Sequence, residues 1–401
     1  MSTSILYHAF GIKHVKYKKT VFAAGEVRIH AETTKKLDRC PACKSSNVTR
    51  QGKKTRPLRL PPMGLVPVWL YLVVHRLECK NCGALKWQHL PFAQPRKSYT
   101  SSFRRLTLEL LKFATIAACA SFLGTGWDLI KDIHKKALEA KYRRVPLKKV
   151  RYIAIDEFSV KKGHVYMTVV IDLATGRILH VAPGKGADSV IPFLKTLARR
   201  APNLRAAATD MSDAYIFAIK KYLPRVAIVL DHYHVTALMN RALDEFRREF
   251  QNECDRLGHK TIKGARFLLL ANYENLARPR RARLDRLLEI NGPLMKMHAM
   301  KEQFRLFWSF DFRVDAERFL EKWCRDAMDS GIRQLQRVGA TLASYRSLLL
   351  NYFDHPISSA KIEGINNKIK TLKRQAYGFR DMEYFKLRLL HLHEQNYSLA
   401  G

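Results

Sequence analysis

Residues 150–158 read Val150-Arg151-Tyr152-Ile153-Ala154-Ile155-Asp156-Glu157-Phe158, an apolar strand with acids near its end. The pattern predicts four further strands, at residues 165–173, 177–181, 204–209 and 226–230, and two helices, at residues 189–199 and 214–222. Short connections join the first three strands into an antiparallel meander, and the helices alternating with the last two add parallel strands beside it. This order predicts a ribonuclease-H-like α/β core.

Three acids are candidates for a catalytic metal site. Asp156 lies within the first strand and Asp210 follows the strand at 204–209, so adjacent central strands would bring their carboxylates together. Glu363 lies in the basic helical stretch Lys361-Ile362-Glu363-Gly364-Ile365-Asn366-Asn367-Lys368-Ile369-Lys370, which is otherwise suited to hold phosphates. A carboxylate there repels a polyanion unless a divalent cation lies between them. Because two or three carboxylates suffice to hold Mg²⁺ or Mn²⁺, these acids predict metal-dependent phosphoryl transfer on DNA.

Other acids and histidines near the strand ends have ordinary structural interpretations. Glu157 alternates to the opposite face of the strand, Asp172 precedes a Thr-Gly turn, and Asp210 alone is also typical of a helix cap. The stretch Asp231-His232-Tyr233-His234 follows the fifth strand. Its Asp231, His232 and His234 are auxiliary metal or DNA ligands in one interpretation, and a capped helix start with packed histidines in the other.

Two cysteine pairs lie in the first hundred residues, in Cys40-Pro41-Ala42-Cys43 and Cys79-Lys80-Asn81-Cys82-Gly83. The region between them contains the basic, Pro-rich segment 53–67 and a strand at 68–77, and strands at 15–21 and 26–31 precede it. Two such knuckles separated by a β-hairpin predict a zinc ribbon in which Cys40, Cys43, Cys79 and Cys82 hold a structural Zn²⁺. The alternative, four incidental cysteines, requires both spacings to arise by chance.

Residues 98–147 have a helical pattern. Ser102 would cap a helix over 103–113, Thr115 a second helix to residue 120, and a glycine turn at 123–126 leads into a third over 127–141. A helix-turn-helix would present Lys131, His134, Lys135 and Lys136 of the last helix to DNA. A plain three-helix bundle has the same pattern.

The composition restricts the partner. The 401 residues include 72 Lys and Arg against 35 Asp and Glu, a formal net charge of +37. This excess predicts a nucleic-acid binder whose affinity falls with salt. A membrane is disfavoured, because the apolar stretch 106–123 is interrupted by Glu109 and Lys112, and the amino terminus lacks a signal-peptide pattern. We expect a cytoplasmic protein.

The chain is predicted to be a multidomain α+β protein. The expected parts are a zinc-binding β-rich module, a helix-turn-helix domain, the first part of the core, an all-α insertion and C-terminal core helices: residues 1–97, 98–147, 148–234, 235–352 and 353–401. The last part holds helices at 359–375 and 382–394. Within the insertion, Trp308 and Trp323 are expected to pack among helices, or alternatively to stack on an unpaired base.

These motifs, in this order, resemble the bacterial insertion-sequence transposases of the ISL3 family, which belong to the DDE class. The resemblance covers nearly the whole chain. Its motifs are Ala154–Ser159 with Lys162-Gly163-His164 and Tyr166, Asp210-Met211-Ser212 with Tyr215, Asp231–His234, His355–Ser358, Glu363–Lys370 and Arg374–Arg380. Family members commonly have Asn-Gly or Asn-Ala shortly before the Glu, whereas this chain has Ser358-Ser359-Ala360-Lys361, where either serine can cap the helix.

The resemblance implies that Asp156, Asp210 and Glu363 are the catalytic triad and that the helical block is inserted between the second Asp and the Glu. Cleavage at a transposon end would free a 3′-hydroxyl that attacks target DNA, with no covalent protein intermediate. Residues after Glu363 would orient or grip phosphates: Asn366, Lys368, Lys370, Lys373 and Arg374. The resemblance also implies a bacterial, nucleoid-associated homodimer on paired double-stranded DNA ends.

Two other functions also fit the motifs. A DNA-binding regulator would combine the zinc module and the helix-turn-helix without catalysis, and a ribonuclease-H-like nuclease or resolvase would cut without joining. A serine or tyrosine recombinase is disfavoured because the acids indicate metal chemistry.

Overall fold

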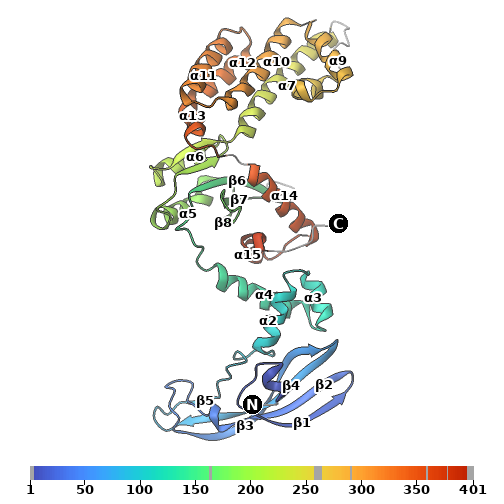
Figure 1. The fold of residues 1–401 in the computed structure, drawn as a ribbon, viewed down its shortest axis with the longest axis vertical. Coiled ribbons are helices and arrows are strands. Elements are labelled where there is room, and N and C mark those ends of the chain that lie inside the picture. The colour runs from blue at the N-terminus through green and yellow to red at the C-terminus, as the bar shows by residue number, and fades with distance from the viewer. Residues whose placement is uncertain are drawn as a thin grey trace. The chain divides into compact units, whose positions relative to one another are not determined.

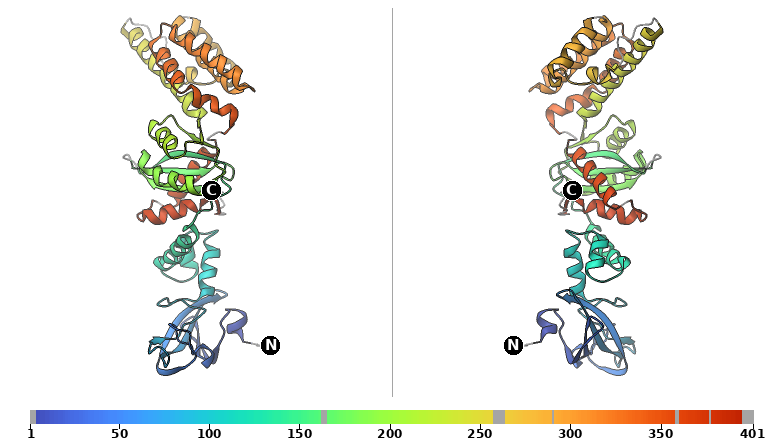
Figure 2. Two further views of the ribbon diagram at one scale, coloured as in Figure 1. Left: turned by 90° about the vertical axis from the view of Figure 1, so that its left-hand side faces the viewer. Right: turned by 90° about the vertical axis from the view of Figure 1, so that its right-hand side faces the viewer.

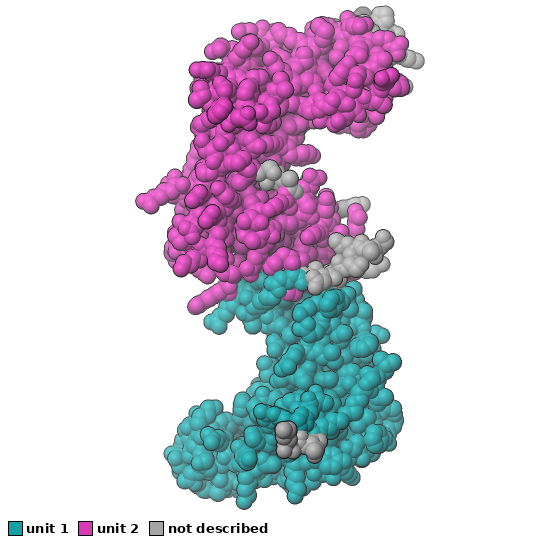
Figure 3. Space-filling model, in the orientation of Figure 1, with its two compact units in different colours: residues 1–143, 394–401 teal, residues 144–393 magenta. Residues whose placement is uncertain are grey.

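A computed structural model describes residues 4–161, 165–256, 264–289, 291–357, 360–376 and 378–394. The chain divides into two compact units, residues 1–143 with 394–401 and residues 144–393 (Figure 3). Some motif positions lie outside the described residues: Lys162, Gly163, His164, Ser358, Ser359 and Tyr377. The division into five parts remains a prediction.

The first unit contains a five-stranded sheet (Figure 1). Its strands are β1 (Val15–Ala23), β2 (Glu26–Thr33), β3 (Val48–Met63), β4 (Val66–Cys79) and β5 (Leu85–Trp87). They run in the order β1-β2-β4-β3, with β5 also paired to β4, and β2 and β4 are parallel. Period-two alternation buries one face, as on β4 at Val68, Leu70, Leu72 and Val74.

The Pro-rich segment 53–67 precedes the strand at 68–77, as expected, and most of it is itself part of the long strand β3. Pro57 pairs with Tyr71 of β4. Because β3 is at the edge of the sheet, the missing N–H of a proline costs no ladder bond on its outer side. The β3–β4 hairpin that was predicted between the cysteine pairs is present.

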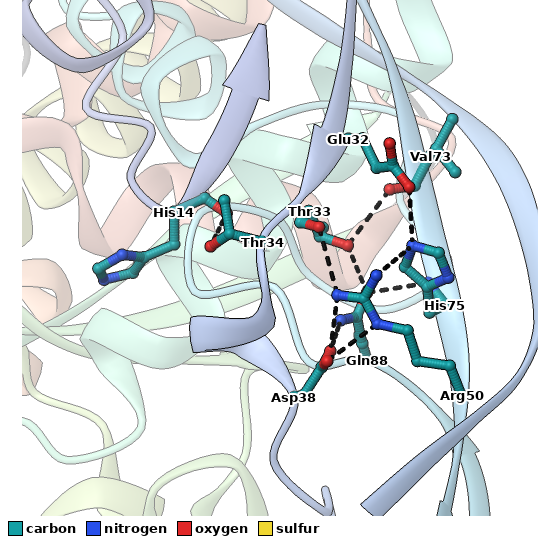
Figure 4. Close-up of polar contacts among 9 residues, drawn as sticks. All are labelled: His14, Glu32, Thr33, Thr34, Asp38, Arg50, Val73, His75 and Gln88. Atoms are coloured by element: carbon teal, nitrogen blue, oxygen red, sulfur yellow. Dashed lines mark hydrogen bonds and ion pairs between the residues drawn. The ribbon is translucent and has the colours of Figure 1, made fainter.

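A polar cluster ties β3 to its neighbours (Figure 4). The guanidinium of Arg50 contacts Asp38 Oδ2 at 2.9 Å and His75 Nε2 at 3.0 Å. Gln88 accepts hydrogen bonds from the His75 backbone N–H at 2.8 Å and from the Thr33 hydroxyl at 2.7 Å. The cluster links β2, β3, β4 and the segments that follow β2 and β5.

The remaining helices of the first unit are α1 (Ile5–His8), η1 (Lys35–Leu37), α2 (Ser101–Leu110), α3 (Ile116–Phe122) and α4 (Trp127–Tyr142). The prediction of Ser102 as the first cap is wrong, because Thr100 Oγ1 accepts the Phe103 N–H and the helix begins at Ser101. Thr115 caps α3 as predicted.

The second unit contains a mixed sheet in the order β10-β9-β6-β7-β8. Its strands are β6 (Tyr152–Lys161), β7 (Val165–Asp172), β8 (Ile178–Pro183), β9 (Ala206–Thr209) and β10 (Ala227–Leu230). As predicted, β6, β7 and β8 form an antiparallel meander, while β9 pairs parallel to β6 and β10 parallel to β9. The turn role of Asp172 is confirmed, because its carboxylate accepts bonds from Ala174 N and Thr175 Oγ1.

Helices cover both faces of this sheet (Figures 1 and 2). On one face, α5 (Ala187–Arg200) and α6 (Asp213–Tyr222) bury apolar side chains against it. On the other, α14 (Ala360–Gln375) packs against β6 and α15 (Met382–Leu390) against β8. Where a helix was expected to continue to residue 394, the chain forms η4 (Leu392–Glu394).

A helical block lies between β10 and α14. It comprises α7 (His232–Arg256), α8 (Arg266–Leu270), η2 (Tyr273–Asn275), α9 (Arg278–Glu289), α10 (Gly292–Arg305), η3 (Leu306–Ser309), α11 (Arg313–Met328), α12 (Arg333–Ser344) and α13 (Arg346–Asp354). Its buried side chains continue the core under the sheet. The Asn351 amide also donates to the Ile228 carbonyl of β10 at 2.8 Å. No helix within the described ranges is long and apolar enough to cross a membrane.

Candidate active site

Alternation along β6 places its two acids on opposite faces of the sheet. Asp156 faces α14, where its Oδ2 accepts the Asn366 side-chain N–H at 2.8 Å. Its Oδ1 accepts the backbone N–H of Glu157 at 2.7 Å. Burial raises the pKa of Asp156 above its ordinary value, although these two donors and His234 oppose the rise. Two hydrogen-bond donors therefore hold the Asp156 carboxylate in a partly desolvated environment.

The register of the sheet places Asp210 near Asp156. Asp210 follows β9 directly, and the parallel register sets Ala208 of β9 opposite Ala154 of β6. Asp156 is two residues after Ala154 on β6, and Asp210 is two residues after Ala208, just beyond the end of β9. Their proximity is electrostatic as well as geometric, since the charge of Asp210 contributes to the raised pKa of Asp156. The backbone N–H of Ser212 donates to Asp210 Oδ1 at 3.2 Å.

Glu363 lies on α14 with an exposed side chain. It precedes Asn366 by three residues, so the two side chains lie on the same side of the helix, one turn apart. The structure does not gather Glu363, Asp156 and Asp210 into one ligand set. Within the described residues, the group of three or more ligand atoms all within 4.8 Å of one another consists of four cysteines.

Two features around Asp156 fit a cation. Its half-buried carboxylate lies near a second negative charge, which is costly unless positive charge compensates for both. Asn366 donates through Nδ2, but its buried Oδ1 has no hydrogen-bond partner. An amide oxygen and carboxylates are ligands that Mg²⁺ accepts. The Asp156 carboxylate and the neighbouring Asn366 Oδ1 are thus oxygen donors of a chemically suitable kind.

The cations of α14 divide into two groups. Lys361 donates to the Leu173 carbonyl at 2.6 Å, and Lys373 to the Ser159 carbonyl at 2.5 Å, so these two lysines fasten the helix to the sheet. Lys373, which was predicted to bind DNA, therefore binds a backbone carbonyl of the protein in this structure. The other cations predicted to bind phosphates have exposed side chains, Lys368, Lys370 and Arg374, whereas Asn366 is half-buried.

A polar chain on the opposite face was not foreseen from sequence. The Tyr215 hydroxyl, which is fully buried, donates to Glu157 Oε1 at 2.9 Å and lies 2.9 Å from Thr168 Oγ1. Burial raises the pKa of Glu157, and the charges of Asp210 and Asp156 add to the effect. Glu157 is therefore electrostatically part of the acidic site although it points away from α14. In the sequence, the position of Glu157 next to Asp156 was the signal that could have indicated this role.

The histidine motif at the start of α7 has two different histidines. His232 stacks on Trp308 with ring centroids 3.6 Å apart, and burial lowers its pKa to about 4. His234 is partly exposed, lies 3.8 Å from Asp231 Oδ2, and acts electrostatically on Asp156. The packed-histidine interpretation therefore fits His232, whereas His234 borders the acidic site.

Both tryptophans of the helical block pack within the protein. Trp308 stacks on His232, and the buried Trp323 donates its indole N–H to the Met300 carbonyl at 3.1 Å. The expectation of helix packing is confirmed for both. Stacking on a base is wrong for Trp323, which is 1% exposed.

The four predicted zinc ligands converge in the first unit. Their sulfurs lie within 4.8 Å of one another, with Cys40 and Cys82 Sγ 3.7 Å apart and Cys43 and Cys79 Sγ 3.5 Å apart. A tetrahedral zinc with Zn–S bonds of about 2.3 Å has S–S edges of about 3.8 Å, so the set fits structural zinc. The residue after each pair adopts positive φ, 66° at Lys44 and 67° at Gly83.

The predicted DNA-facing helix α4 presents part of its expected set. Lys131 lies over the Trp127 ring at 5.3 Å, Lys136 pairs with Asp132 at 2.7 Å, and Lys135 is partly buried. The prediction that His134 faces DNA is wrong, because its side chain is 3% exposed. His134 lies next to Ile133 and one turn after Ile130, and all three residues are buried.

Comparisons with known proteins show which family the chain resembles. Residues 153–389 match the ISL3 family of DDE transposases, described as "Transposase". Residues 36–82 match a family described as "zinc-finger of transposase IS204/IS1001/IS1096/IS1165".

Individual relatives extend the match along the chain. The transposase for insertion sequence element IS1001 of Bordetella parapertussis is 31% identical over 387 residues, 96% of this chain and 95% of that protein. The transposase for insertion sequence element IS1557 of Mycobacterium tuberculosis is 25% identical over 370 residues, 86% and 83% of the two chains. A solved Drosophila P element transposase strand transfer complex aligns at a TM-score of 0.36 and 10% identity, covering 79% of this chain and 94% of that chain. That last likeness is too weak to assign a fold.

Proposed function

Because the chain belongs to the ISL3 family of DDE transposases, we propose that it cuts DNA at the ends of an insertion sequence and joins the freed strands to target DNA. The observation that carries the proposal is the Asn366–Asp156 hydrogen bond, which connects residues 210 positions apart and docks α14 on β6. It brings the turn bearing Glu363 to the side of the sheet where Asp156 and Asp210 lie.

Asp156, Asp210 and Glu363 are the proposed catalytic carboxylates on a ribonuclease-H-like sheet. The strand order β10-β9-β6-β7-β8 supports that fold. Mg²⁺ or Mn²⁺ held by these acids would neutralise charge on the attacking and leaving oxygens. Glu363 is one helical turn from Asn366, and we propose that it completes the set by a side-chain movement when DNA binds.

The chain's own residues would hold the DNA and the acids in register. Lys368, Lys370 and Arg374 are exposed on α14 and would bind backbone phosphates near the scissile bond. Lys361 and Lys373 keep the helix in place through their backbone bonds. Asn366 would fix the Asp156 carboxylate.

The first unit is proposed to recognise the terminal inverted repeats. Its zinc ribbon and the helices α2, α3 and α4 are two DNA-binding elements, the second as a helix-turn-helix with Lys131, Lys135 and Lys136 near phosphates. Since each end requires a set of acids, we propose a homodimer on paired ends.

The test is incubation of purified full-length protein with a labelled duplex carrying the element's own end, with and without Mg²⁺. Wild type is expected to release a 3′-hydroxyl end and then form strand-transfer products. Glu363→Gln should lose both products while binding the end normally. Glu383→Gln, which changes an exposed acid on α15, should behave as wild type.

The rival functions have different outcomes in the same assay. A nuclease or resolvase gives cleavage without joined products. A regulator gives binding without cleavage in both wild type and Glu363→Gln. Either result would overturn the transposase proposal.

A further inference from the structure

A basic hollow of about 580 Å³ lies in the helical block, against α7 and α8. The α7 residues that line it recur at spacings of three and four, so they form one face of the helix. They are Tyr233, Thr236, Ala237, Asn240, Arg241, Asp244, Arg247 and Arg248. Arg266 and Leu270 of α8 complete the lining.

The charge of this hollow is unbalanced. Arg247, Arg248 and Arg266 surround one carboxylate, that of Asp244, at 2.9, 3.6 and 3.5 Å. Arg241 is a fourth guanidinium in the lining. The lining therefore carries four positive charges and one negative charge, which is more positive charge than pairing with Asp244 requires. The side chains of Arg248 and Arg266 are 64% and 56% exposed, so their charge is available to an anion.

The hollow also offers groups suited to a base. Tyr233, at one end of the face, is 72% exposed and large enough to act as a stacking platform. Asn240 Oδ1 is buried in the lining without a hydrogen-bond partner. An exocyclic amino group of a base would supply the missing donor. Guanidiniums beside an aromatic ring and an amide acceptor match the chemistry of a nucleotide.

The position of the hollow relates it to the acidic site. Tyr233 directly precedes His234, their rings lie 5.6 Å apart, and His234 acts electrostatically on Asp156. From Tyr233 to Arg248 the helix rises about 1.5 Å per residue, or roughly 22 Å. A strand leaving the acidic site can therefore follow this face of α7.

We propose that this hollow binds an unpaired segment of the DNA strand next to the cleavage site, with phosphates on Arg241, Arg248 and Arg266 and a base on Tyr233. The segment must be unpaired, because a stacking platform needs an exposed base face that a duplex interior does not offer. The inference rests on the proposed function, since it takes DNA to be the substrate at Asp156.

The test compares two labelled duplexes that differ only in a short single-stranded extension, measured by fluorescence anisotropy with full-length protein over a range of salt. The double variant Arg241→Ala, Arg248→Ala should lower affinity for the extended duplex about tenfold or more and leave the blunt duplex unchanged. Its salt slope should fall by about 0.7 for each arginine removed. Arg318→Ala, on an exposed arginine of α11 away from the hollow, is the matched control.

Tyr233 is tested separately. Tyr233→Ala should cost about tenfold in affinity for the extended duplex, and Tyr233→Phe, which keeps the ring, should restore it. Equal losses on both duplexes, losses matched by Arg318→Ala, or no loss at all would overturn the inference. Glu363→Gln should keep the preference for the extended duplex. Failure of cleavage with this preference intact would therefore count against the proposed catalysis and not against the hollow.

Discussion

Asn366 of α14 donates its side-chain amide to Asp156 Oδ2 of β6 at 2.8 Å, and its own Oδ1 stays buried without a partner. One side chain thus holds a candidate catalytic carboxylate and offers a second oxygen beside it. The bond also fixes how α14 meets β6, and Glu363 lies one turn earlier on the helix with an exposed side chain.

Asn366→Ala is expected to slow DNA cleavage about 10- to 100-fold, because a hydrogen bond to a charged group contributes about 1.5–3 kcal/mol. End binding should not change. Single-turnover cleavage measures the rate, and circular dichroism checks the fold. Asn367→Ala, the exposed neighbour on the same helix, is the control. A cleavage rate within twofold of wild type would show that Asn366 does not position Asp156.

Asp156→Asn is expected to stabilise the metal-free protein at neutral pH while abolishing cleavage. Burial raises the pKa of Asp156 in the folded state above its ordinary value of 3.8. The ionised carboxylate therefore costs stability above the raised pKa, and the cost disappears as pH falls towards 3.8. Urea unfolding in EDTA at neutral and acidic pH measures this. A stabilisation that persists unchanged at low pH would refute the electrostatic cause.

Acidification is expected to destabilise the second unit through histidines whose pKa is lowered in the folded state. Burial lowers the pKa of both His232 and His298 to about 4. The unfolded chain takes up these protons near pH 6.5, so stability is complete above that pH and falls as pH drops towards 4, by about 1.4 kcal/mol per unit for each histidine.

His232→Phe should reduce that pH dependence, as measured by urea unfolding between pH 7.5 and 4.5, and the remainder should come from His298 and from His180, whose pKa burial also lowers. The same substitution at the exposed His89 of the first unit should leave it intact. If both variants show the wild-type slope, His232 is not the titrating group.

Loss of one zinc ligand is expected to unfold the cysteine knuckles. Wild-type protein should contain one zinc per chain, and Cys43→Ser should contain much less and lose end binding. Elemental analysis gives the metal content, and anisotropy gives the binding. Cys324→Ala, which removes a buried thiol elsewhere, should keep its zinc. Equal zinc in all three proteins would contradict the assignment of the four sulfurs.

Local sequence patterns predicted much of the second unit. The apolar run before Asp156 and the short run before Asp210 mark two strands, and their parallel pairing brings the positions of the two acids near each other. The basic stretch around Glu363 marks a helix. The same alternation correctly placed Glu157 on the far face.

Contacts between segments far apart in the chain could not be predicted from local sequence patterns. Tyr215 reaches Glu157 across 58 residues, and Lys373 reaches Ser159 across 214, so no local pattern encodes either bond. His134 looked like part of a basic surface because two lysines follow it, but helical geometry turns it inward with Ile130 and Ile133. Local sequence patterns identified the residue types at the site but not their hydrogen-bond partners.

The distance in sequence between Asp156 and Asn366 has a consequence for synthesis on the ribosome. The first unit and the strand carrying Asp156 are made early, whereas α14 emerges only near the end of translation. We expect a chain that terminates before residue 360 to retain the zinc knuckles and α4 but to have no cutting activity. We expect such a fragment to compete with the complete protein for the same DNA ends. Premature termination would then also lower the rate of transposition.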